Sequence, residues 1–128
     1  MSTPATEAIT FHALHDERYP IHLVAERLEP YLRRIVERVH PERILLFGSY
    51  AYGVPTQHSD FDLLIVRRGI TSAKQSNLEI RRAIRDVPAP PASFTFLSQT
   101  PEALDENLRH GSFIYREIVD KGVELYAA

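Results

Sequence analysis

The sequence predicts a small α/β domain, and three features of the chain indicate this class. Short apolar runs bounded by polar residues or glycine are typical of buried strands, and they fall at residues 44–47, 60–66 and 93–98. Segments with apolar residues every three or four positions, typical of helices, stand before, between and after these runs. At 128 residues, with 44% hydrophobic and 25% charged side chains, the chain has the size and composition of one globular domain.

The first helix is expected over residues 21–39, where the apolar positions form one stripe. These positions are Ile21, Val24, Leu28, Leu32, Ile35 and Val39. Pro30 lies inside the stretch, so the helix is either kinked there or made of two helices that meet there, and Pro41 ends it. Residues 1–19 are polar and show no periodicity. We therefore expect a loose N-terminal arm over residues 1–19 and a single domain over residues 20–128.

Three further helical segments follow the second apolar run. Residues 72–87 carry helix-forming residues with apolar positions on one side. Thr100-Pro101 offers a residue suited to cap a helix, followed by proline at the first helical position. The last helical stretch runs over residues 113–119 and is closed by Gly122. The predicted order is helix, strand, turn, strand, helix, strand, helices, with at least three strands.

Composition excludes several classes of protein. Fifteen basic and seventeen acidic side chains give a net charge of −2, which argues against direct nucleic-acid binding through a broad basic surface. The chain has no cysteine, so disulfides and thiolate metal sites are excluded. No apolar run approaches membrane-spanning length, and the first residues lack the pattern of a signal peptide. We expect a cytoplasmic protein without a membrane segment.

Two carboxylates at the start of the second predicted strand carry the first sign of chemistry. Asp60 and Asp62 are separated by one residue, so on a strand they project from the same face, about 7 Å apart. Two neighbouring carboxylates destabilise each other unless a cation or a proton lies between them. Mg²⁺ is the expected ion, because it combines one or two carboxylates with phosphate oxygens.

Gly48 and Ser49 follow the first predicted strand. The absent side chain of Gly48 lets the backbone approach a ligand closely, and Ser49 adds a hydroxyl. A short helix beginning at Ser49 would point its first N–H groups at a phosphate. For this dipeptide to share a site with Asp60 and Asp62, the end of one strand must lie beside the start of the next. We therefore expect the two strands to be antiparallel neighbours.

These residues carry a family resemblance. Leu46-Phe47-Gly48-Ser49 followed by Asp60-Phe61-Asp62-Leu63-Leu64 resembles the signature of the DNA polymerase beta-like nucleotidyltransferase superfamily. Length and element order extend the resemblance over nearly the whole domain to its small branch, the minimal nucleotidyltransferases (MNT proteins). Many MNT proteins are antitoxin partners of HEPN-domain ribonuclease toxins.

The resemblance implies a nucleotidyltransferase fold with a small mixed sheet packed with helices. It implies that Asp60 and Asp62 are the catalytic carboxylates and bind Mg²⁺, and that Gly48 and Ser49 bind the phosphates of ATP or another nucleoside triphosphate. The expected reaction is transfer of AMP to a hydroxyl of a protein or a small molecule. A HEPN-domain protein is the expected partner.

The chain departs from this family pattern at two cationic positions. Many relatives have arginine where this chain has Tyr50 and Tyr52. The loss of these two cations is expected to weaken binding of a triphosphate. Arg67, Arg68 or Lys74 is expected to restore it.

The second departure concerns a third carboxylate, which active relatives place on the next strand. Residues 93–98 contain none, and no acidic residue lies between Asp86 and Glu102. Two-metal catalysis clamps the attacking and the leaving oxygen, and two carboxylates hold a second ion poorly. The alternative is therefore a catalytically degenerate protein that binds nucleotide or a partner. Thr95, and after it Ser93, is the position at which the missing carboxylate is expected.

Other candidates have ordinary structural explanations beside their functional ones. His58 lies two residues before Asp60, but a lone histidine in a loop is more often solvated than a ligand. The cluster Arg81, Arg82 and Arg85 is expected to be a solvated helix face, with a partner or nucleic-acid contact as the alternative. The run Phe113-Ile114-Tyr115 is expected in the core, unless it forms an exposed edge that docks a partner helix.

Overall fold

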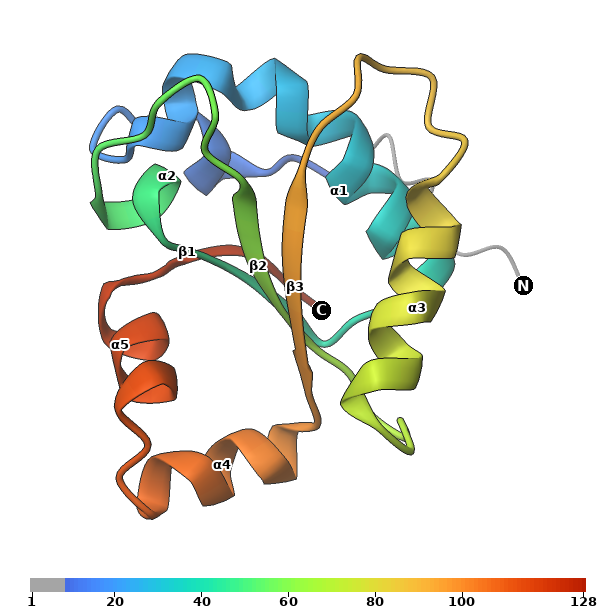
Figure 1. The fold of residues 1–128 in the computed structure, drawn as a ribbon, viewed down its shortest axis with the longest axis vertical. Coiled ribbons are helices and arrows are strands. Elements are labelled where there is room, and N and C mark those ends of the chain that lie inside the picture. The colour runs from blue at the N-terminus through green and yellow to red at the C-terminus, as the bar shows by residue number, and fades with distance from the viewer. Residues whose placement is uncertain (1–8) are drawn as a thin grey trace.

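The computed structural model describes residues 9–128, and its centre is a four-stranded mixed sheet (Figure 1). The strands are β1 (Arg43–Phe47), β2 (Phe61–Val66), β3 (Phe94–Gln99) and β4 (Val123–Ala127). They lie in the order β3-β2-β1-β4. β1 is antiparallel to both of its neighbours, whereas β2 and β3 are parallel. The predicted α/β class and the antiparallel pairing of the first two strands are confirmed.

Helices cover both faces of this sheet (Figure 1). The helices are η2 (His12–His15), η3 (Pro20–Val24), α1 (Ala25–Val39), α2 (Ser49–Tyr52), α3 (Ala73–Ile84), α4 (Pro101–Arg109) and α5 (Phe113–Lys121). Thr100 caps α4 by accepting the N–H of Ala103 at 3.0 Å, as predicted. Ser72 caps α3 in the same way through the N–H of Gln75. Gly122 is the C-cap of α5, also as predicted.

Alternation along β2 divides the core into two layers. Phe61, Leu63 and Ile65 belong to a large core that also contains the buried residues of α1 and α3. Leu64 and Val66 belong to a smaller core with Leu104 of α4 and Ile118 of α5. Since successive side chains of a strand point to opposite faces, Asp62 is directed to the side of α4 and α5.

Two boundaries differ from the sequence-based expectation. α1 is continuous through Pro30, and the junction of two helices falls instead between Val24 and Ala25, where η3 ends. β4 was not predicted as a separate strand. Its five residues, VELYA, are too short to show a period by themselves, and pairing with β1 makes them a strand.

The expectation of a loose arm is wrong for residues 9–19. Phe11 and Leu14 are 1% and 0% exposed and belong to the large core. The ring of Phe11 contacts Tyr126 of β4, with 6.5 Å between centroids. Two apolar residues in one short turn carry too little periodicity to be read from the sequence. The first eight residues of the predicted arm lie outside the part that the structure describes.

Across residues 9–128, every helix is too short or too polar to span a lipid bilayer.

Replacement of a core residue in η2 tests whether this segment belongs to the domain. We expect Leu14→Ala to lower the free energy of unfolding by about 3 kcal/mol, because it leaves a cavity in a filled core. Leu23→Ala is the matched control: Leu23 is 71% exposed, and its loss should change stability by less than about 0.5 kcal/mol. Urea unfolding followed by circular dichroism measures both, and equal effects would contradict the packed arrangement.

Candidate functional site

The predicted dipeptide and the predicted carboxylates meet where β1 ends. Phe47, the last residue of β1, is paired with Asp62 in the antiparallel register. The next residue, Gly48, turns the chain into α2 with φ 76° and ψ −156°, a conformation that favours glycine. A Cβ placed on Gly48 would lie 2.1 Å from Oδ2 of Asp62. The absent side chain of Gly48 is therefore the space that the Asp62 carboxylate occupies.

Asp60 and Asp62 act on each other electrostatically. Burial raises the pKa of Asp62 above its ordinary value, and the negative charge of Asp60 raises it further. A hydrogen bond from the Thr95 side chain lowers the same pKa and partly offsets these effects. Among residues 9–128, neither aspartate takes part in an ion pair with a basic side chain. The pair is thus a concentration of negative charge without an internal counter-ion.

The structure brings Thr95 of β3 to the same place. In the parallel register of β2 and β3, Thr95 is the partner of Asp62. Thr95 is exposed, whereas its neighbours Phe94 and Phe96 are buried on the opposite face of the sheet. The polar face of the third strand therefore does adjoin the carboxylates, at the position expected for the missing carboxylate.

Ser49 follows Gly48 directly and is the first residue of the short helix α2. The N–H groups of Ala51 and Tyr52 both donate to the carbonyl oxygen of Gly48, at 3.0 and 3.1 Å. Tyr50 is buried, and its ring lies 4.9 Å from that of Phe61, centroid to centroid. Tyr50 is thus a core residue that anchors α2, whereas Tyr52 is partly exposed.

Arg67, Arg68 and Lys74, which were expected to replace the family's arginines, lie far from Asp60 and Asp62. Arg67 lies five residues beyond Asp62 along β2, about 16 Å away. Its guanidinium donates to Ser76 and Glu79, and Arg68 donates to Glu42. Lys74 lies in the first turn of α3, which follows this far end of the strand. Spacing along the sequence could not show that these side chains leave the sheet at its opposite end.

One cation at this end of the sheet was not identified from the sequence. The guanidinium of Arg27, from α1, lies over the ring of Phe61 at 5.5 Å from its centroid. Phe61 stands between Asp60 and Asp62 in the chain, but its side chain belongs to the large core. Arg27 therefore reaches this end of the sheet on the face opposite Asp62. No local motif could identify this residue, because the contact joins segments more than thirty positions apart.

The remaining candidates behave as structural residues. His58 is exposed in its loop, and its Nε2 lies 3.4 Å from the side-chain amide of Gln57. Arg81 is exposed, as expected, and it also donates to the carbonyl oxygen of Phe94 at 3.1 Å and lies over the ring of Phe96. Arg82 and Arg85 are exposed as well.

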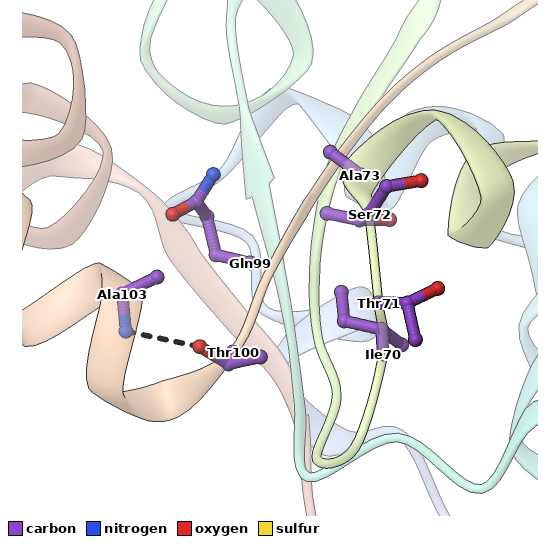
Figure 2. A pocket seen from close by; sticks show the side chains of 8 residues that line it. Ile70, Thr71, Ser72, Ala73, Gln99, Thr100 and Ala103 are labelled. Carbon is purple, nitrogen blue, oxygen red and sulfur yellow. Dashed lines mark hydrogen bonds between the residues drawn. The ribbon is translucent and has the colours of Figure 1, made fainter.

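A hollow of about 170 Å³ lies at the opposite end of the sheet, between the start of α4 and residues 70–73 (Figure 2). The hydroxyls of Ser72 and Thr100 that line it are engaged as helix caps. It contains neither of the predicted aspartates.

The donor set of the site suits one divalent ion better than two. Within the described residues there is no group of three or more histidine, cysteine, aspartate or glutamate side chains that could hold a metal ion. Asp60 and Asp62 supply two carboxylates. The raised pKa of Asp62 means that its charged form is disfavoured, and a bound cation would stabilise that form. Two carboxylates with phosphate oxygens are an ordinary coordination for Mg²⁺. The residues present therefore fit one such ion carried with a nucleotide.

Comparison with known proteins supports the family indicated by the motif. Residues 30–121, which include both parts of the site, match the family model described as Polymerase beta, Nucleotidyltransferase. The chain therefore belongs to the polymerase beta nucleotidyltransferase family, and its fold is of that class. No curated protein matches the chain significantly. A crystal structure of a toxin-antitoxin with AMP-PNP is similar in structure to this chain. The match covers 78% of this chain and 73% of the chain in that structure, with 16% identity and a TM-score of 0.49.

The contact between Gly48 and Asp62 can be tested by adding a single methyl group. Gly69 has a similar positive φ of 74°, and a Cβ there would meet nothing within 4 Å. We expect Gly69→Ala to lower the free energy of unfolding by about 1 kcal/mol, through backbone strain alone. Gly48→Ala should cost about 3 kcal/mol, because it adds a collision with the carboxylate. Equal losses in urea titrations of the two variants would contradict the contact.

Proposed function

We propose that the protein is a Mg²⁺-dependent nucleotidyltransferase that transfers AMP from ATP to a hydroxyl of a protein or a small molecule. The observation that carries this proposal is the junction at which the Asp62 carboxylate fills the space beside Gly48. Family membership supplies the reaction class, and the unpaired negative charge of Asp60 and Asp62 supports a metal-bound nucleotide at this point.

In this reaction each residue of the site has a separate task. Asp60 and Asp62 would hold the ion, and Gly48 and Ser49 would receive the phosphates beside it. The ion supplies neutralisation of phosphate charge during the transfer. The acceptor oxygen forms a bond to the α-phosphorus, and the bond from that phosphorus to pyrophosphate breaks. Pyrophosphate leaves with the bonding electrons, and the hydroxyl proton passes to solvent.

Metal-dependent binding is the first consequence to test. We expect ATP to bind measurably only with Mg²⁺, and Asp62→Asn to abolish this dependence because it removes a charged ligand. The fold should be retained, since burial already disfavours the charged form of Asp62. Asp105→Asn, at an exposed position of α4, is the matched control and should bind like the wild type. Calorimetry that gives the same affinity with EDTA and with Mg²⁺, in wild type and Asp62→Asn alike, would refute the proposal.

A helical HEPN-domain protein is the partner that the MNT resemblance suggests. Phe113 and Ile114, at the start of α5, are 81% and 50% exposed, so they leave an apolar surface for a partner. Tyr115 is less available, because it is half-buried and packs against the smaller core. We therefore place the contact at Phe113 and Ile114 and not at Tyr115.

Co-expression tests the partner surface. We expect a HEPN-domain protein to co-purify with the wild type, and Phe113→Ser to weaken the complex at least tenfold, which is about 1.4 kcal/mol. Leu78→Ser changes an exposed apolar residue of α3 and should have no effect. The supporting assay adds Mg²⁺ and labelled ATP and looks for label on the partner. Elution of only free protein from a sizing column would remove this part of the proposal.

A catalytically degenerate, nucleotide-binding protein is the second candidate, and Thr95 is the observation that favours it. This residue offers a hydroxyl where a third carboxylate would stand beside Asp62. Without that carboxylate, the described residues provide two acidic ligands and no more at this place.

Restoring the carboxylate distinguishes the two candidates. If the site is degenerate, Thr95→Asp should raise transfer of label from ATP at least tenfold, since each factor of ten is about 1.4 kcal/mol of barrier. Ser93→Asp is the comparison. The carbonyl oxygen of Ser93 accepts the N–H of Phe61, so this residue lies nearer Asp60. Rapid transfer by the wild type, unimproved by either aspartate, would contradict the degenerate candidate.

A further inference from the structure

The Asp62 carboxylate is flanked differently by its two neighbouring strands. On the β1 side, the carboxylate fills the space that Gly48 leaves by having no side chain, and Oδ2 lies 2.1 Å from where a Cβ would stand. On the β3 side, at the same level, stands the exposed Thr95. The order β3-β2-β1 makes these two residues approach the carboxylate from opposite sides. Asp62 is thus bounded by the backbone of Gly48 and by the hydroxyl of Thr95, neither of which neutralises its charge.

We infer that Thr95 is a positioning residue of this site: its hydroxyl, next to Asp62 in the register of β2 and β3, donates a hydrogen bond to the carboxylate and holds it beside Gly48, where it meets a divalent cation. This inference rests on the proposed function, because a cation at Asp62 is part of that proposal.

The physical reason is the freedom of a carboxylate that has no strong partner. The terminal torsion of an aspartate is broad, so the plane of the carboxylate rotates easily unless a hydrogen bond fixes it. The ion pairs among residues 9–128 include neither Asp60 nor Asp62, so no arginine or lysine fixes the plane here. A hydroxyl donor orients the group and leaves its charge available for a metal. Loss of such an outer partner typically weakens metal binding by about 10- to 100-fold.

The position of Thr95 separates this role from a role in stability. Thr95 is exposed, and the residues on either side of it, Phe94 and Phe96, carry the packing of β3 on the large core. Valine has the shape of threonine without the hydroxyl and is favoured in strands. Thr95→Val therefore removes the hydrogen bond and little else, and Thr95→Ser keeps the hydroxyl.

The test is a titration with Mn²⁺, followed by electron paramagnetic resonance, with and without a non-hydrolysable ATP analogue. We expect Thr95→Val to raise the dissociation constant for Mn²⁺ at least tenfold, and Thr95→Ser to stay within about threefold of the wild type. Thr71→Val, an exposed threonine at the opposite end of the sheet, is the matched control and should bind like the wild type. The urea midpoints of all four proteins should agree.

Three outcomes decide the inference. Wild-type affinity in Thr95→Val overturns it. So does an equal loss in Thr95→Ser and Thr95→Val, since the hydroxyl would then not be the determinant. If Thr95→Val unfolds, Thr95→Ala, which also lacks the hydroxyl, replaces it in the same titration. If the wild type binds no Mn²⁺, with or without the analogue, the proposed function is refuted. The positioning role is then refuted as well, because it requires a cation at Asp62.

Discussion

The antiparallel pairing of β1 with β2 is the constraint on which the rest of the site depends. It joins the last residue of one strand to the beginning of the other, so that Phe47 stands opposite Asp62. Gly48 and Ser49 then follow directly beside the carboxylate. The buried apolar residues of both strands stabilise this pairing, and a slip by one residue would turn Asp62 into the large core. The hydrophobic pattern of the strands therefore specifies the register that assembles the site.

The site also has a cost in stability, which the fold tolerates. Two carboxylates lie near each other without a basic partner among the described residues, and burial disfavours the charged form of one of them. Gly48 adopts a backbone conformation that other residues rarely accept. Local features that oppose folding and are maintained by their surroundings are typical of functional sites. Here the surroundings are the two cores and the ring of Tyr50 against Phe61.

The two layers of the sheet separate structure from chemistry. The large core, with α1 and α3, contains the side chains that face away from the carboxylates. The smaller core, with α4 and α5, shares its face of the sheet with Asp62 and Thr95. The far end of the sheet holds Arg67 in a network with Ser76 and Glu79. That network joins α3 to the sheet and is about 16 Å along β2 from the carboxylates.

The sequence by itself determined the α/β class and three of the four strands, and it identified Gly48, Ser49, Asp60 and Asp62 as candidate site residues. These depend on short-range rules: alternation in strands, helical periodicity, and the spacing of charged groups on one face. Only the tertiary structure decided that residues 9–19 pack in the core and that 123–127 form a strand. It also placed Arg27 on the face of the sheet opposite Asp62, and Arg67 at the far end of β2. Such contacts join segments far apart in the chain, and no local pattern encodes which distant surface a side chain will meet.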